Sequence, residues 1–194
     1  MSIASSVFLT YKRLLTIGYT VLLRSSFRSF DATSRIVPPF RFCGLKGVQI
    51  GARVMIHDHC WFQLEKAATL IVKDHAAIGM NATISVAEYV EIGEYVLTGR
   101  NVFISDHNHE YHDISTPISL QGITPASKVT IGSGTWLGHN SVVLPGSSIG
   151  RNCVIGANSV VKGFVPDYSV AVGVPARVVK HFSKQAGAWT RNSE

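Results

Sequence analysis

The sequence predicts an all-β solenoid, a chain wound in triangular coils with one short strand on each side. The main observation is a six-residue period that phases much of residues 50–166. From residue 131 the chain reads IGSGTW, LGHNSV, VLPGSS, IGRNCV, IGANSV and VKGFVP, with an aliphatic residue first in each hexad and a small residue or valine fifth. A helix repeats its apolar face every 3.6 residues and a plain strand every two, so neither explains a period of six. One aliphatic and one small side chain pointing inward per side would fill a coil interior.

Glycine marks the corners of the predicted coils. It follows the aliphatic residue of a hexad at positions 51, 79, 93, 99, 132, 138, 150 and 156. Glycine is favoured where the chain turns and a Cβ is unwelcome. The hexads form blocks at about residues 48–64, 72–105 and 129–166, with a two-residue insertion between Ile84 and Ile92. We expect these blocks to stack into one solenoid.

One long interruption, residues 106–128, separates the last two blocks. A loop of this length inside a compact repeat is usually functional, because a repeat gains no stability from breaking its strand ladder. It holds three of the eight histidines. The phase is lost after Pro166, so residues 167–180 are expected to cap the open sheet edge. Residues 181–194 are predicted to be a polar tail, at most a frayed helix.

Residues 1–45 are predicted to be a helical extension ahead of the coils. Apolar and basic residues alternate over residues 3–30, and Pro38-Pro39 ends the segment. The longest uncharged run, Leu14 to Leu23, is shorter than the about 20 residues needed to span a bilayer. No secretory leader is expected. Two interpretations stay open: the helix packs on the solenoid or a neighbouring subunit, or it lies on an anionic membrane face.

The positive charge of the chain is concentrated in this extension. Residues 1–41 hold six basic side chains and one acidic, which is +5 of the total of +6. No nucleic-acid-binding motif accompanies the charge, so nucleic acid is not an expected partner. Cys60 and Cys153 fall on inward hexad positions, and Cys43 has no motif around it. Without a disulfide framework, a reducing cytoplasm is the expected compartment.

Two motifs make the resemblance to a known family more specific. Residues 104–109 read ISDHNH and residues 174–180 read VPARVVK. Together with the hexads, they resemble the hexapeptide-repeat acyltransferases over about residues 46–180, and in particular the branch that O-acetylates sugars of bacterial surface polysaccharides and lipopolysaccharide. The resemblance implies a left-handed parallel β-helix, acetyl-coenzyme A as acyl donor, a glycan acceptor, no metal and a homotrimer. The basic apolar N-terminus would place the enzyme in the cytoplasm, at the inner membrane face.

The catalytic residues implied by the resemblance lie where the coil opens into the long loop. A sugar hydroxyl must lose its proton as it attacks a thioester, and a neutral imidazole is a suitable base. Matching Ser105-Asp106-His107 to the family motif selects His107, whereas counting strictly in hexads favours His109. Asp106 is the candidate to orient the base, although in an extended segment its side chain would point away from His107. Its alternative role is to cap a turn.

The family also implies a binding site for the acyl donor along the C-terminal coils. Trp136, at an outward hexad position, would line the groove, and Gly138 would offer a backbone N–H to the oxyanion. The remaining expected donor contacts are His139, Ala157, Lys162, Arg177 and Lys180, the last three at the phosphates. An aspartate by which the small-sugar enzymes contact their acceptor has no counterpart in Val86-Ala87-Glu88. The acceptor is therefore not inherited, and outward His57 and His59 are weak candidates to line its site.

Two other classes share the solenoid. A zinc carbonic anhydrase of the hexapeptide type uses three histidines, two of them spaced H-x4-H, as are His107 and His112, with His75 upstream. Against it, this pair falls in an irregular insertion, and metal ligands need rigid placement. A non-enzymatic scaffold or ice-binding solenoid would not need the histidine-bearing loop, and no ranks of exposed threonine are visible.

Overall fold

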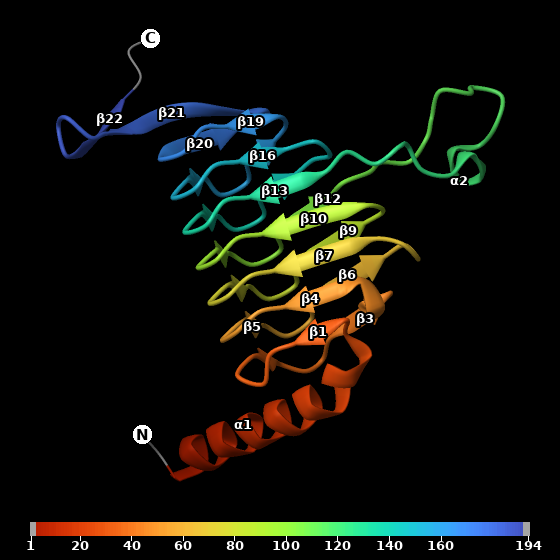
Figure 1. Ribbon diagram of the computed structural model, residues 1–194, viewed down its shortest axis with the longest axis vertical. Coiled ribbons are helices and arrows are strands. Elements are labelled where there is room, and N and C mark those ends of the chain that lie inside the picture. The colour runs from red at the N-terminus through yellow and green to blue at the C-terminus, as the bar shows by residue number, and fades with distance from the viewer. Residues whose placement is uncertain (1–2, 192–194) are drawn as a thin grey trace.

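The computed structural model describes residues 3–191, which form a parallel β-solenoid of three sheets (Figure 1). The left-handed β-helix predicted with an N-terminal helix and a loop insertion is confirmed. Sheet A stacks β1 (Ser29–Phe30), β4 (Val48–Ile50), β7 (Thr69–Val72), β10 (Tyr89–Ile92), β13 (Val129–Ile131), β16 (Ser148–Ile149) and β19 (Phe164–Val165). Sheet C stacks β3 (Arg41–Cys43), β6 (Trp61–Leu64), β9 (Thr83–Val86), β12 (Phe103–Ser105), β15 (Val142–Val143) and β18 (Val160–Val161).

Sheet B is the longest of the three and changes direction at its C-terminal end. Its parallel part stacks β2 (Arg35–Ile36), β5 (Met55–Ile56), β8 (Ala77–Ile78), β11 (Leu97–Thr98), β14 (Trp136–Leu137), β17 (Val154–Ile155) and β20 (Ser169–Gly173). The strands β21 (Ala176–Ser183) and β22 (Ala188–Arg191) then pair antiparallel. A reversed strand cannot continue the coil, so this extension ends the solenoid.

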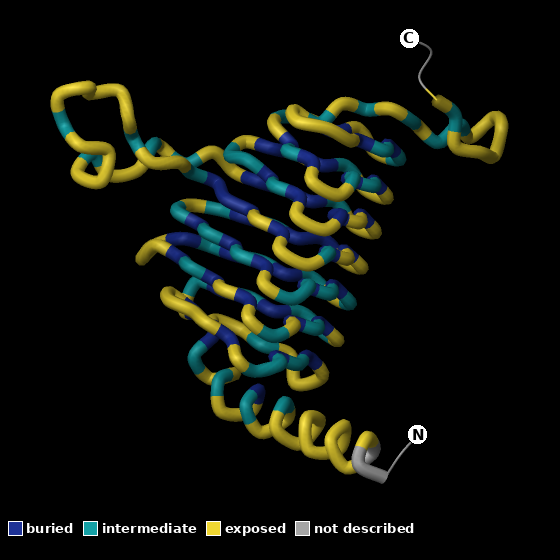
Figure 2. The backbone as a smooth tube through the Cα atoms, turned by 180° about the vertical axis from the view of Figure 1, so that it is seen from behind, coloured by how far each residue is buried: buried dark blue, intermediate teal, exposed yellow. Residues whose placement is uncertain are grey.

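The core is a stack of mostly aliphatic side chains, with one inward residue on each two-residue strand and two on longer strands such as β7 and β10. In sheet B the register aligns Ile36 with Ile56 and Ile56 with Ile78, and further along Leu137 with Ile155. All five side chains are fully buried. Figure 2 shows the buried positions recurring along each coil while the turns stay exposed. The six-residue period predicted this column, because each side of a coil contributes the same inward position.

The corners between sheets B and C confirm that glycines mark the turns of the coil. They also contain a row of hydrogen-bonded asparagines. A Cβ on Gly79 would lie 2.2 Å from the carbonyl oxygen of Gly99, so the coils stack too closely for a side chain there. The next corner residues include asparagines with positive φ, a conformation that asparagine tolerates. Asn101 donates to Asn140, and Asn140 donates to Asn158. These amides form a short ladder along one edge.

Both ends of the solenoid differ from the sequence prediction. The first coil begins at β1 and not near residue 46. Its residues depart from the hexad pattern, because the large Phe40 is buried where a small residue is usual and no glycine follows Ile36. Residues 181–191 are not a frayed helix but the end of β21 and the strand β22. Phe182 and Trp189 pack edge to face across this hairpin, 5.6 Å apart. The polar composition of the segment concealed its strand pairing.

The helix α1 (Ile3–Leu23) lies across the N-terminal end of the solenoid (Figure 1) and is followed by a single 3-10 turn, η1 (Arg24–Ser26). Thr20 is buried on the side of α1 that faces the solenoid. Its hydroxyl accepts a hydrogen bond from the backbone N–H of Ile36 at 2.9 Å. The hydroxyl of Tyr19 donates to the carbonyl oxygen of Phe40 at 3.2 Å. The helix is therefore fixed to the first coil by these hydrogen bonds and by Tyr19 and Leu23, which pack against the core. A second 3-10 turn, η2 (Leu45–Gly47), leads into β4.

The long loop of residues 106–128 projects from the side of the solenoid (Figure 1). Its two arms run antiparallel, with the backbone N–H of Glu110 donating to Gly122 and that of Thr124 donating to Asn108. Beyond this ribbon the chain forms one short helical turn, α2 (Ile118–Gln121). The ribbon gives the loop a defined root beside β12.

Shortening a core side chain should destabilise the solenoid far more than shortening an exposed one. Leu137→Ala removes a fully buried side chain and is expected to cost about 2–5 kcal/mol of unfolding free energy. Leu120→Ala, on the exposed loop helix with 74% of the residue accessible, should change the stability by less than about 0.5 kcal/mol. Chemical unfolding followed by circular dichroism compares the two, and equal losses would contradict the assigned core.

Candidate active site

The strongest candidate site lies at the root of the long loop, where Asp106 and His107 are in contact. The Nδ1 atom of His107 is 2.8 Å from a carboxylate oxygen of Asp106. Asp106 is fully buried, and the His107 side chain is 13% exposed. A carboxylate accepts hydrogen bonds, so it favours the tautomer with the proton on Nδ1 and leaves Nε2 as the acceptor. The imidazole therefore has a fixed tautomer and a free basic nitrogen.

Asp106 is held by the backbone of the neighbouring coil. Its two carboxylate oxygens accept the N–H groups of Ala87, Glu88 and Tyr89, each at 2.8 Å. These three residues form the corner with the two-residue insertion, between β9 and β10. A buried carboxylate needs several donors to offset its lost hydration, and this corner supplies them. Capping a turn and orienting the histidine are thus roles of the same side chain.

A local turn brings the two neighbouring side chains together. In an extended chain they would point to opposite faces. The hydroxyl of Ser105 instead donates to the carbonyl oxygen of His107 at 2.8 Å and accepts the backbone N–H of His107 at 3.3 Å. This turn begins at Ser105, the last residue of β12, and brings the His107 ring against Asp106.

His107 lines an open cavity of about 420 Å³. The floor is the outward face of three stacked strands of sheet C, and it carries Trp61, Gln63, Thr83, Ser85, Phe103 and Ser105. The wall is the root of the loop, with Asn108, His109 and Ile123 beside His107. The cavity thus offers two partly exposed aromatic rings next to a histidine base and several hydroxyl and amide groups. Glu65 completes its lining.

His109 lines the same cavity in a different setting. It is exposed and forms an isolated antiparallel bridge with Ile123 across the loop ribbon. Among the described residues, no ion pair or side-chain hydrogen bond orients its ring, whereas His107 has Asp106. The geometry of a fixed base therefore favours His107 over His109.

The residues expected to hold the acyl donor are spread over the C-terminal coils. Trp136 is 48% exposed on the outward face of sheet B. The register aligns Trp136 with Val154, Val154 with Val170, and Val170 with Lys180. With strands about 4.8 Å apart, Trp136 and Lys180 are roughly 14 Å apart along one column. Arg177 is exposed on the same strand, β21.

Ala157 lies in the turn between β17 and β18, Lys162 directly follows β18, and both are exposed. Ala157 follows a corner glycine, and its small side chain leaves the backbone accessible. No ion pair within residues 3–191 involves Lys162, Arg177 or Lys180. Cations at or near the surface without carboxylate partners suit the phosphates of a nucleotide ligand.

Gly138 and His139 occupy another corner of the coil. The backbone N–H of Gly138 donates to the carbonyl oxygen of Ile155 at 2.8 Å, so the ladder already uses this donor. The Nδ1 atom of His139 accepts the N–H of Arg100 at 2.9 Å. His139 and Arg100 line a small cavity of about 170 Å³ together with His57. His57 is thus outside the His107 cavity.

The histidines considered as zinc ligands lie in unrelated settings. His75 stacks on Tyr95 with ring centroids 4.4 Å apart, and His112, on the exposed loop, is bonded to Glu110. Across residues 3–191 no group of three or more His, Cys, Asp or Glu side chains is arranged to hold a metal ion. The outward His59 pairs with its neighbour Asp58 at a coil corner and lines none of the cavities described above.

The buried cysteines have unreactive surroundings. Burial raises the pKa of the Cys60 thiol to about 12, and burial also raises the pKa of Cys153. The Cys60 sulfur lies 3.1 Å from the carbonyl oxygen of Gly79 inside the coil. Since the thiolate is the nucleophilic form, neither side chain is suited to carry an acyl group.

The cavity floor is the part of the site that the sequence reasoning missed. Trp61 and Phe103 lie on different coils, and the strand register places both beside Thr83. The sequence does hold a signal for these residues, because a large aromatic side chain at an outward hexad position indicates a covered surface. That signal points to Trp136 as a site residue, and the same argument applies to Trp61 and Phe103.

Comparisons with known proteins identify the family. Residues 128–163 match the family description "Bacterial transferase hexapeptide (six repeats)". A putative acetyltransferase of Staphylococcus aureus is 36% identical over 137 residues, which are 59% of this chain and 69% of that protein. The chain belongs to the hexapeptide-repeat transferases.

Other relatives of this hexapeptide-repeat transferase include proteins named for acetyl transfer. A probable acetyltransferase of Mycobacterium tuberculosis is 41% identical over 71% of this chain and 45% of its own length. The putative lipopolysaccharide biosynthesis O-acetyl transferase WbbJ of Escherichia coli is 38% identical over 63% of this chain and 65% of its own. The chain thus spans about half to two thirds of these two proteins.

A solved structure shows the same fold. The N-acyltransferase AntD of Bacillus cereus, in complex with dTDP and 3-hydroxybutyryl-CoA, aligns with a TM-score of 0.73 at 19% identity, over 87% of this chain and 90% of that one.

The assigned tautomers predict opposite signals for two histidines. In its neutral form, the His107 ring should carry its proton on Nδ1. The neutral His139 ring, whose Nδ1 accepts a backbone N–H, should carry its proton on Nε2. Asp106→Asn places an amide beside the His107 ring and should shift its tautomer balance, leaving His139 unchanged. Nitrogen-15 correlation spectra of the imidazoles report both, and an Nε2 proton on wild-type His107 would contradict the assignment.

Proposed function

We propose that this protein is an acetyl-coenzyme A-dependent O-acetyltransferase that acts on a sugar hydroxyl of a bacterial surface polysaccharide or its precursor. The observation that carries the proposal is the pair of Asp106 and His107 at the edge of an open cavity. The similarity to an O-acetyl transferase named for lipopolysaccharide biosynthesis supports the acceptor class.

His107 supplies general base catalysis in this proposal. Its Nε2 accepts the proton of the sugar hydroxyl as the oxygen attacks, and the buried carboxylate of Asp106 stabilises the imidazolium that forms. The proton then passes from His107 to the departing thiolate, which restores the neutral ring. Acetyl-coenzyme A supplies the acyl group as a thioester. The inert settings of Cys60 and Cys153 favour direct transfer without an acyl-enzyme.

The cavity floor suits a sugar acceptor. Trp61 and Phe103 expose ring surface on which the apolar face of a pyranose can stack. Gln63, Ser85 and Glu65 offer donors and acceptors to the hydroxyl groups around that ring. This lining supports a carbohydrate acceptor.

The donor would lie along the outward faces of the C-terminal coils. Trp136 would cover one side of its extended arm, and the small side chain of Ala157 would allow close approach to the backbone. Lys162, Arg177 and Lys180 would hold the phosphates. The three cations lack carboxylate partners within the described chain, so they fit a phosphate-bearing ligand.

We further propose a homotrimer. An outward column of sheet B is apolar over successive coils: Met55, Ala77, Leu97, Trp136, Val154 and Val170. Leu97 and Trp136 are about half exposed, and a second copy would cover such a flat apolar stripe.

Removing the base should abolish transfer. His107→Ala is expected to lower acceptor-dependent release of coenzyme A by about 10²–10⁴-fold. His109→Ala, in the same cavity, is the matched control and should lose less than about tenfold. Thiol release is measured with a panel of sugar acceptors on variants with wild-type circular dichroism. Equal losses in the two variants would contradict His107 as the base.

Neutralising the phosphate contacts should weaken the binding of the donor and spare the chemistry. Each of Lys162→Ala, Arg177→Ala and Lys180→Ala is expected to raise KM for acetyl-coenzyme A by up to about tenfold, with a small change in kcat. Lys46→Ala and Lys66→Ala, which alter exposed lysines near the N-terminal coils, serve as controls. A KM that stays unchanged in all three variants would remove these side chains from the donor site.

A further inference from the structure

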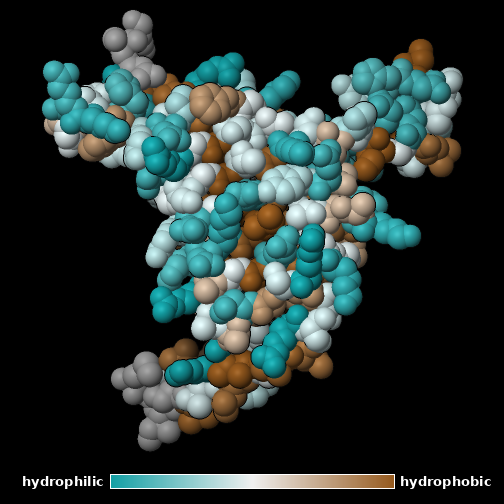
Figure 3. Space-filling model, viewed as in Figure 1, coloured by the Kyte–Doolittle hydropathy of each residue, from teal (hydrophilic) through white to brown (hydrophobic). Residues whose placement is uncertain are grey.

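The outward side of α1 is an exposed apolar face with no partner in the described structure. It comprises the exposed residues Val7, Phe8, Tyr11, Leu14, Leu15, Val21 and Leu22. Leu14 is 64% exposed and Leu22 is 73% exposed. Figure 3 shows these apolar residues gathered along the helix at one end of the molecule. A contiguous apolar surface of this kind marks an interaction site.

The apolar face has no part in holding the helix to the solenoid. That task falls to the opposite side, where Thr20 is buried and Tyr19 donates to the carbonyl oxygen of Phe40. At 100° per residue, Val7, Tyr11 and Leu22 lie roughly 140–180° around the helix from Thr20. The helix is therefore attached by these polar contacts and by the packing of Tyr19 and Leu23 against the core, and it presents its other apolar side chains outward.

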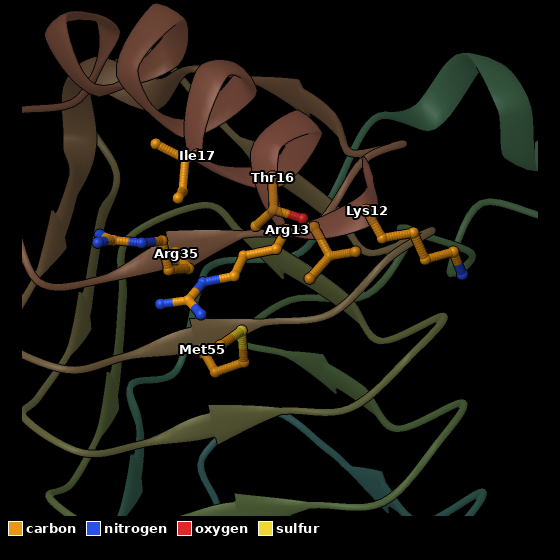
Figure 4. Close-up of a pocket in the computed structure, with 7 residues that line it drawn as sticks. Lys12, Arg13, Thr16, Ile17, Arg35 and Met55 are labelled. Atoms are coloured by element: carbon orange, nitrogen blue, oxygen red, sulfur yellow. The ribbon is translucent and has the colours of Figure 1, made fainter. Parts of the chain in front are cut away.

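Basic side chains flank the apolar face. Lys12 and Arg13 extend from α1 over the first coils, where they line a cavity of about 380 Å³ with Arg35 and Met55 (Figure 4). In the described chain no carboxylate forms an ion pair with Lys12, Arg13 or Arg35. Residues 1–41 carry six basic side chains against one acidic. The charge is complementary to an anionic surface.

The position of the helix leaves this face accessible. It crosses the end of the solenoid opposite to β21, β22 and the long loop (Figure 1). A flat surface can approach that end without meeting either projection. No helix within residues 3–191 has the length and hydropathy required to cross a bilayer.

We propose that α1 docks the protein on a membrane surface that contains anionic lipid. The helix lies in the plane of the interface, with Leu14 and Leu22 among the acyl chains. Lys12 and Arg13 reach back to the phosphate groups, as long basic side chains do at such a boundary. Arg35, on the first coil, adds to the positive field near the surface. The solenoid axis then points away from the membrane.

A second copy of the chain is a poorer occupant of this face. Pairing two such faces would bring Lys12 and Arg13 of one copy close to the same cations of another, with no acidic residue in the helix to offset them. Anionic lipid neutralises these cations while it buries the same apolar side chains.

Vesicle binding tests the proposal with the full chain and independently of acetyl transfer. Sedimentation with phosphatidylcholine vesicles containing about one-third phosphatidylglycerol should show binding that weakens at high salt. Leu14→Ser with Leu22→Ser should weaken it by at least about tenfold. Lys12→Gln with Arg13→Gln should weaken it by about tenfold on anionic vesicles.

Matched controls alter exposed residues of the same types elsewhere. Ile114→Ser with Leu120→Ser on the long loop, and Lys66→Gln with Lys184→Gln, should leave vesicle binding unchanged. Absence of binding by the wild-type protein would overturn the proposal, as would full binding by the serine variant. A change of oligomeric state in that variant, measured by sedimentation without lipid, would instead assign the face to a subunit contact and also overturn it.

Discussion

The narrow interior of the triangular coil is the constraint on which the rest of the structure depends. Each side has room for only one or two inward side chains, and successive coils must stack in register for these side chains to touch. The same register aligns the outward residues into columns. Trp61 and Phe103 therefore share a cavity floor, and Trp136 shares a column with Lys180. A repeat built for packing thus also positions the residues of the site.

The site forms where the ladder is interrupted. The chain leaves the coil after Ser105, and the inward position that an aliphatic residue would fill is taken by Asp106. Its charge is offset by three backbone N–H groups of the adjacent corner, which the two-residue insertion makes available. The orientation of His107 depends on this buried carboxylate, so the inserted corner and the long loop act as one structural unit.

The sequence predicted the fold well because a six-residue period is a strong and unusual signal. The core positions, the corner glycines and the loop all follow from it. It did not predict the first coil or the C-terminal hairpin, where strands are short or pair antiparallel and the period is absent. Nor did it predict contacts made by a local turn: the Ser105 hydroxyl turns His107 toward Asp106, whereas strand alternation separates them. The cavity floor depends on register between distant coils, which no local pattern contains.

The helix and the catalytic corner lie at different levels of the solenoid, so the proposed contact with a membrane and the proposed chemistry are physically separate. A sugar acceptor that is anchored to lipid would bring the two together, since docking through α1 holds the cavity at a fixed height above the surface.

The central claim is that Asp106 holds His107 as the general base. The most direct test is kcat for acceptor-dependent release of coenzyme A by Asp106→Asn, measured on folded protein. We predict a fall of at least about 10²-fold, with KM values for donor and acceptor within a few-fold of wild type, because the variant disturbs the tautomer and not the binding surfaces. An unchanged kcat would contradict the account.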